Sequence, residues 1–296
     1  TEERLGVPVV TTVDTVYLGN CANGRPVWFD RAAYEADLIV PINRVKLHTD
    51  FVGPIQSGLC KMLVIGLGNH KGCSAVHEEA PEVFAGAIEE TARLILQKAP
   101  VGFGIAILEN AYDKTYAVEA VPAEHLVERE KELVQIAKGN MPYIMLDEAD
   151  VIVCGAIGKD ISGAGFDPNI LGRSSVLKQF VLHIPRYQRL VLCDVTPASH
   201  GNGIGVGLFD VITKKVAEQL DLESMYANAI ACNCLGDASV PCTVDDEETA
   251  IRVALKCCRN IDRDHPRIIR IQNTLHLGEI EAVSYTHLRA HETCAD

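Results

Sequence analysis

The residues that could do chemistry are concentrated between Asn43 and His77. Histidine supplies a general base or a metal ligand near neutral pH, and lysine supplies a nucleophile or a phosphate contact. Glycine lets the backbone come close to a ligand. The segment interleaves all three types, with histidines at 48, 70 and 77, lysines at 46, 61 and 71, and glycines at 53, 58, 66, 68 and 72. This composition predicts a ligand site, although the last three glycines would also suit a plain strand-to-helix turn.

Short apolar runs alternate with amphipathic segments along the chain, which predicts the α/β class. The runs are rich in β-branched residues and are bounded by glycine, proline or acidic residues, so we expect buried parallel strands. These strands are predicted at 37–42, 103–108, 150–154 and 190–194. Apolar residues at helical spacing predict helices at 81–98, 123–138, 208–220 and 247–258.

These elements predict two Rossmann-like α/β lobes with the active site in the cleft between them. Open α/β sheets bind ligands beyond the carboxyl ends of their strands, and the segment from Asn43 follows a predicted strand. We expect a first domain at 1–125, which holds the site at 43–77, and a second domain at 126–282. The segment 139–142, which contains Gly139 and Pro142, is the expected hinge.

Composition and charge narrow the classes of function. Apolar residues make up 48% of the 296 residues, charged residues make up 23%, and the net charge is −13. Nucleic acids and anionic membranes require a basic face, so neither is an expected partner, and no apolar run is long enough to cross a bilayer. The eleven cysteines form no CxxC pair, and Cys154 and Cys193 lie in apolar runs, which indicates a reducing, cytoplasmic location.

Residues 283–296 are expected to be foreign to the natural protein. Val283 to Thr293 resembles the translation of a transposase-type sequencing adapter. We therefore expect a natural chain that is cut near Ala282 and that has also lost residues before Thr1. Little or no activity is expected from residues 1–296 alone, because missing strands would leave an unpaired sheet edge.

The segment at 43–77 resembles the nickel-pincer lactate racemase family of 2-hydroxyacid racemases and epimerases. In that family a histidine base precedes a Gly/Ser-rich stretch and a lysine, and another histidine follows sixteen positions after the lysine. The same order occurs here in His48, Gly53, Ser57-Gly58, Lys61 and His77. The thirteen positions between His48 and Lys61 exceed the family spacing, so the chain looks like a divergent homologue. The resemblance covers residues 5–282 and includes 158–169 and 199–202.

The resemblance implies a role for each of these residues. Lys61 would covalently hold the nickel-pincer nucleotide, a pyridinium-3-thioamide-5-thiocarboxylate mononucleotide with one carbon–nickel bond. His77 would complete the square-planar nickel, which accepts sulfur and imidazole ligands. His48 would take the hydroxyl proton of the substrate while the Cα hydride moves to the cofactor, and this role needs a pKa near neutral. His70 and Lys71 would contact the cofactor phosphate, with simple surface charge as the alternative.

Three residues of the second domain are candidates for binding the substrate carboxylate. Lys159 and Arg173 follow the predicted strand at 150–154, and the position of Lys159 resembles that of a substrate-binding lysine in the family. His200, followed by Asn202, lies in a glycine loop before a predicted helix, where an anion can bind. A solvated loop residue is the alternative for Lys159, and an ordinary turn is the alternative for His200.

The sequence thus predicts an isomerase that racemises or epimerises a small 2-hydroxy acid, lactate-like or a sugar acid. It would depend on the enzymes that synthesise its cofactor. One alternative is a non-catalytic protein that binds a nucleotide or a carboxylate, which would tolerate the loss of His48. The other is a hydrolase with a simple metal, which needs three protein ligands, and the sequence offers no acidic residues at convincing spacing.

Overall fold

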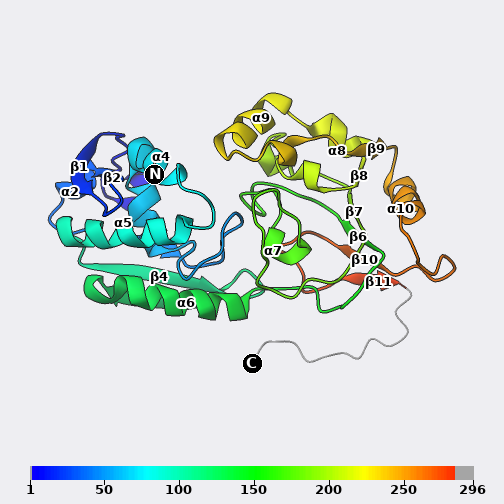
Figure 1. The fold of residues 1–296 in the computed structure, drawn as a ribbon, viewed down its shortest axis with the longest axis horizontal. Coiled ribbons are helices and arrows are strands. Elements are labelled where there is room, and N and C mark those ends of the chain that lie inside the picture. Colours follow the sequence, from blue (N-terminus) through cyan, green and yellow to red (C-terminus); the bar gives the residue numbers. More distant parts are fainter. Residues whose placement is uncertain (1, 284–296) are drawn as a thin grey trace. The chain divides into compact units, whose positions relative to one another are not determined.

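The chain divides into two compact units, Thr1–Met141 and Pro142–Asp296, in a computed structural model that describes residues 2–283 (Figure 1). The expected foreign tail lies outside the described residues except for Val283, which ends strand β11 (Glu281–Val283). The division falls within the expected hinge at 139–142, and not at the expected boundary after residue 125. The reason is that α6 (Leu126–Asn140) packs on β4 (Phe103–Glu109) and so belongs to the first unit.

Unit 1 contains a small mixed sheet, with α6 running alongside β4 (Figure 1). β3 (Ile42–Arg44) pairs parallel with β4, and β4 pairs antiparallel with β5 (Thr115–Pro122). A Cβ at Gly104 of β4 would lie 2.6 Å from Leu59 and 3.3 Å from Leu126, so this glycine lets the strand approach the helices. The remaining elements are α1 (Glu2–Leu5), β1 (Thr15–Asn20), β2 (Pro26–Asp30), α2 (Arg31–Tyr34), α3 (Leu59–Lys61), the π-helix η1 (Met62–Gly66), α4 (Asn69–His77), α5 (Phe84–Lys98) and the 3₁₀ turn η2 (Ala123–His125).

Two sequence predictions fail in unit 1. The predicted strand at 37–42 is reduced to a single bridge between Ile39 and Val101, because Pro41 has no N–H for a ladder, and β3 begins only at Ile42. The strand predicted at 103–108 exists as β4, but β5 pairs with it in the antiparallel direction. The mixed α/β class is confirmed, whereas a Rossmann-like sheet in unit 1 is not.

Unit 2 contains a six-stranded sheet in the order β11-β10-β6-β7-β8-β9, which is parallel except for β11. All four residues of β6 are buried, as expected for a central strand with covered faces. Helix α10 covers one face, and α7, α8 and α9 contribute to the core on the other. The elements are β6 (Val151–Cys154), α7 (Pro168–Leu171), β7 (Arg189–Leu192), η3 (Pro197–Ser199), η4 (Val206–Leu208), β8 (Val211–Thr213), α8 (Lys214–Gln219), α9 (Leu222–Ala231), η5 (Leu235–Ala238), β9 (Cys242–Val244), α10 (Glu247–Lys256) and β10 (Ile268–Ile271).

The helix predicted at 208–220 is wrong in its first half. Val211, Ile212 and Thr213 form β8, and only 214–219 is α-helical. The three residues are β-branched and buried between β7 and β9, where tertiary pairing outweighs the helical spacing of their neighbours.

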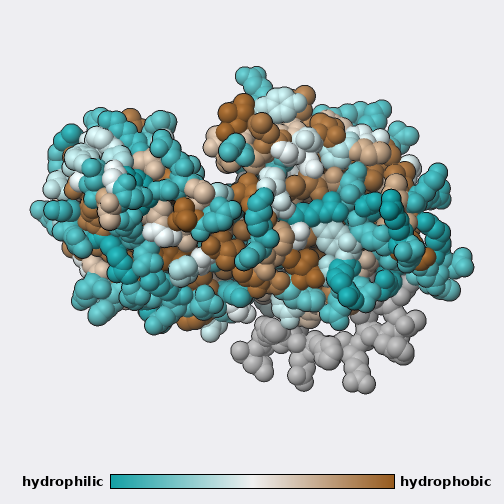
Figure 2. Space-filling model, in the orientation of Figure 1, coloured by the Kyte–Doolittle hydropathy of each residue, from teal (hydrophilic) through white to brown (hydrophobic). Residues whose placement is uncertain are grey.

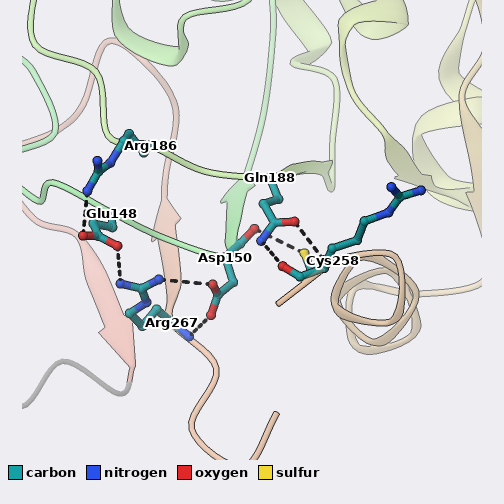
Figure 3. A network of polar contacts seen from close by, with 7 residues as sticks. Glu148, Asp150, Arg186, Gln188, Cys258 and Arg267 are labelled. Carbon is teal, nitrogen blue, oxygen red and sulfur yellow. Dashed lines mark hydrogen bonds and ion pairs between the residues drawn. The ribbon is translucent and has the colours of Figure 1, made fainter. Parts of the chain in front are cut away.

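A polar network ties together the amino ends of three strands in unit 2 (Figure 3). The carboxylate of buried Asp150 accepts a hydrogen bond from the Arg267 backbone at 2.8 Å, and the Arg267 guanidinium pairs with Glu148 at 2.6 Å. Arg186 donates to the same Glu148 at 2.8 Å. These contacts join the segments that lead into β6, β7 and β10, so the network holds the amino ends of these strands together.

The surface of unit 2 carries an exposed apolar stripe on α9. Leu222, Tyr226 and Ile230 follow one another at one-turn spacing and are 44%, 47% and 69% exposed. In Figure 2 brown, hydrophobic residues gather over α9. No helix within residues 2–283 is long and apolar enough to cross a membrane.

Candidate functional site

Lys61 lies at a junction between two kinds of helix. It ends α3, and the π-helix η1 begins at Met62 and leads towards α4, whose last residue is His77. The adjoining Leu59, Cys60 and Leu63 are fully buried, which anchors the segment in the core. π-Helical turns are rare in proteins, but those that occur are often found at functional sites. The local backbone therefore agrees with the chemistry predicted for Lys61.

The side chains of Lys61 and His48 are in direct contact through Nζ and Nε2. On the other side of the imidazole, the Asp50 backbone N–H donates to Nδ1 at 3.0 Å. Because a backbone N–H can only donate, Nδ1 holds the lone pair and Nε2 carries the proton. Nε2–H then donates to Lys61 Nζ, which requires that the amine is neutral.

Burial and charge both disfavour protonation of this pair. Burial lowers the pKa of His48 to about 2, and Lys61 when it is protonated, Lys46 and His77 act in the same direction through their positive charge. Burial also lowers the pKa of Lys61, while the Asp50 carboxylate opposes that shift. The expectation of a near-neutral pKa for His48 is therefore wrong for the protein with a free Lys61 amine, because the imidazole lies desolvated against cationic groups.

A chain of aromatic contacts connects His48 to His77. Phe51 stacks on His48 with ring centroids 4.3 Å apart, and Phe84 lies 4.9 Å from Phe51. Phe84 meets His77 edge-on, also at 4.9 Å. Both phenylalanines are buried, whereas His77 is exposed, so His48 and His77 lie at the two ends of a buried aromatic chain.

The ring of His77 is oriented by its own helix. Its Nδ1 lies 2.8 Å from the Cys73 carbonyl oxygen and 3.3 Å from Cys73 Sγ. Donation from Nδ1–H to the carbonyl leaves the lone pair on Nε2, which is the tautomer of a histidine that ligates a metal through Nε2. The Cys73 thiol also raises the pKa of Lys61 electrostatically, so it lies near the amine.

The two other candidates on α4 lie on the surface. His70 and Lys71 are exposed, and Lys71 Nζ lies 4.6 Å from the centre of the Trp28 ring. This contact is a cation–π pair within unit 1. It involves neither His48 nor Lys61.

The candidates in unit 2 make contacts within that unit. Lys159 donates from its backbone to Ser199 Oγ at 2.8 Å and from Nζ to the Gly163 carbonyl at 2.6 Å. His200 is exposed, with a left-handed φ of 47°, and closes the turn that contains η3. The side chain of Asn202 donates to Asn228 at 3.2 Å.

Arg173 is committed to protein partners. Its guanidinium pairs with Asp210 at 2.6 Å, donates to the Leu208 carbonyl at 2.8 Å and lies over the Tyr187 ring. A carboxylate ligand would have to compete with Asp210 for the N–H groups of the Arg173 guanidinium.

Sequence reasoning missed several residues of the candidate site. Cys73 could have been predicted to lie beside His77, since it precedes His77 by one helical turn. Glu130 could also have been singled out, since it is a charged residue on the face of α6 that buries Leu126, Leu133 and Val134. Asp50, Phe51 and Phe84 could not, because only the folded chain brings them to His48 and His77.

Within residues 2–283, no group of three histidine, cysteine or acidic side chains is arranged to hold a metal ion by itself. The hydrolase alternative therefore has no ligand set in that part of the chain.

No protein-family model and no curated protein matches the chain. Among solved structures it is similar to the lactate racemase apoprotein from Thermoanaerobacterium thermosaccharolyticum, at 15% identity and a TM-score of 0.41. That match covers 78% of this chain and 66% of the racemase chain. A crystal structure of a Thermotoga maritima protein matches at 13% identity and a TM-score of 0.45, over 84% of this chain and 68% of that one. The chain thus spans about two thirds of the length of each.

Proposed function

We propose that the chain belongs to a nickel-pincer-nucleotide-dependent racemase or epimerase that acts on a small 2-hydroxy acid. The observation that carries the proposal is the contact of Lys61 Nζ with His48 Nε2 in a buried position, where desolvation lowers the pKa of the amine. A neutral amine in a desolvated position is the form of lysine that can attack a carbonyl-type carbon. The order of His48, Lys61 and His77 resembles that of the family, and the aromatic chain between the two histidines supports one shared site.

The residues of the candidate site fit the nickel-pincer nucleotide in their donor chemistry. Lys61 Nζ would carry the covalent link, and His77 Nε2 would ligate the nickel, since Nδ1 is engaged by Cys73. When bound, the nucleotide supplies the acceptor for the hydride of the substrate. The exposed His70 and Lys71 would contact its phosphate.

The protein's own residues would handle the proton. His48 Nε2 would take the hydroxyl proton of the substrate, which requires the ring proton to move to Nδ1. Asp50 Oδ2 lies 4.0 Å from Nδ1 and would stabilise the resulting imidazolium. Buried Phe51 and Phe84 would exclude water from this side of the site. Lys159 remains the proposed partner of the substrate carboxylate, with His200 and Arg173 as further candidates.

The test is mass spectrometry of the full chain produced together with the cofactor-synthesis enzymes. We expect Lys61 to carry the mass of the nucleotide, with one nickel per chain. Lys61→Arg should abolish both signals, and Lys71→Arg should keep the covalent link. An unmodified Lys61 without stoichiometric nickel would overturn the proposal.

A second variant separates catalysis from simple binding. His48→Gln should keep the nucleotide on Lys61, because His48 is not its point of attachment, and should lose turnover of the hydroxy acid. A wild type that carries the nucleotide on Lys61 but shows no turnover would favour the non-catalytic alternative, and turnover that survives in His48→Gln would show that His48 is not the base.

A further inference from the structure

A carboxylate is buried beneath the helix that carries Lys61. Glu130 lies on α6 and is 0% exposed. Its neighbours on that face, Leu126, Leu133 and Val134, are apolar and buried. An apolar residue would be the ordinary choice at this position, since acidic side chains are rarely buried without a partner.

The carboxylate caps the first turn of α3. Cys60 N donates to Glu130 Oε2 at 2.9 Å, and Gly58 before the helix has no side chain that could cap it. A Cβ at Gly58 would lie 2.6 to 2.8 Å from the carboxyl atoms of Glu130, so the space that a residue there would fill is already occupied. The free N–H groups at a helix start need an acceptor, and here α6 supplies it.

The arrangement is costly for the fold. Burial raises the pKa of Glu130 to about 7, although hydrogen bonds from Cys60 and from the Leu59 backbone oppose the rise. Its second oxygen, Oε1, has no hydrogen-bond partner among the residues that the structure describes. Removing the carboxylate alone would leave the buried Cys60 N–H without its acceptor, so an apolar residue cannot take over the role of Glu130 at this helix start.

We propose that Glu130 is a positioning residue for Lys61. By capping the turn that contains Leu59 and Cys60, it sets the direction in which Lys61, the next residue, reaches His48. The inference rests on the proposed function only for what Lys61 does once it is positioned.

The experiment measures how readily Lys61 is acetylated in the chain without cofactor. The protein is treated briefly with acetic anhydride at a series of pH values, and peptide mass spectrometry follows Lys61 and the exposed Lys98 as an internal control. Equilibrium unfolding in urea is measured for each variant. Glu130→Leu removes the cap and keeps the bulk, whereas Glu130→Gln keeps an acceptor oxygen.

In the wild type we expect the midpoint of Lys61 acetylation to lie at lower pH than that of Lys98. In Glu130→Leu, the Lys61 midpoint should rise by about one pH unit or more. The unfolding free energy of this variant should fall, because the buried Cys60 N–H loses its acceptor. In Glu130→Gln the midpoint should stay close to that of the wild type. Lys98 should not respond to either substitution.

A Lys61 midpoint that is unchanged in folded Glu130→Leu would overturn the inference, and so would an equal shift in both variants. If the leucine variant does not fold, Glu130→Met replaces it, because methionine adapts to irregular space. No cofactor is needed, so an unloaded Lys61 would contradict only the proposed function. A Lys61 midpoint in Glu130→Leu that stays at the wild-type value would contradict only the positioning role.

Discussion

His48 and Lys61 restrain each other's protonation. The hydrogen bond from Asp50 N places the imidazole proton on Nε2, and that proton faces the amine. A protonated Lys61 Nζ would face the N–H of His48 Nε2, and a protonated His48 Nδ1 would face the Asp50 N–H. In both cases two donors would meet without an acceptor between them. The pair is therefore held neutral by geometry as well as by burial.

Removing the amine should free the imidazole to titrate. In Lys61→Met we expect the pKa of His48 to rise from about 2 by at least about one unit, because an amine that becomes protonated as the pH falls no longer lies against the ring. NMR titration of ring-labelled histidine, with His48→Gln for assignment, measures the shift. Lys71→Met is the control, since Lys71 lies over Trp28. The same His48 pKa in both lysine variants would refute the coupling.

The low pKa of His48 also predicts how stability depends on pH. The unfolded chain binds a proton at His48 below about pH 6.5, and the folded chain does not until about pH 2. The contribution of neutral His48 to the unfolding free energy is therefore fully present above pH 6.5. It is lost as the pH falls, by about 1.4 kcal/mol for each pH unit. Urea unfolding at pH 7.5 and 5.5 should show a smaller loss in His48→Gln than in the wild type. Equal losses would mean that His48 is not desolvated.

At the scale of elements, the start of α3 depends on a side chain seventy residues away. Gly58 and Glu130 fit together because the glycine leaves room for the carboxyl group. The φ of 173° at Gly58 is extended backbone, so the requirement for glycine comes from space and not from conformation.

Gly58→Ala should lower the unfolding free energy by about 1–3 kcal/mol through overpacking against Glu130. The loss should shrink by about 1 kcal/mol or more when Glu130 is also alanine, since the obstructing carboxyl is then absent. Gly86→Ala is the control, because nothing lies within 4 Å of a Cβ there, and it should stabilise the helix slightly. Urea unfolding of the double-mutant cycle measures the coupling, and strict additivity would contradict this account.

At the scale of the whole molecule, the chain is two units with separate cores. The polar network around Asp150 joins strands of the sheet in unit 2 (Figure 3), whereas His48 and Lys61 lie in unit 1. We therefore expect that a substitution in the Asp150 network leaves the pKa of Lys61 unchanged.

Asp150→Ala should lower the unfolding free energy of unit 2 by about 2 kcal/mol, since it leaves Arg267 without its buried partner. The acetylation midpoint of Lys61 should stay unchanged. Glu248→Ala, which breaks an exposed pair with Arg252, is the control and should have almost no effect on stability. A shift of the Lys61 midpoint in Asp150→Ala would show that the units are energetically coupled.

The sequence alone determined the α/β class, the central strands of unit 2 and the segment that holds the candidate site. Apolar periodicity and residue type are local properties, so β6, α5 and the order of His48, Lys61 and His77 could be predicted from them. Only the tertiary structure decided that 211–213 is a strand, because strand pairing outweighs local spacing. It also decided the neutrality of the His48–Lys61 pair and the cap from Glu130, because desolvation and contacts between distant residues arise only when the chain is folded.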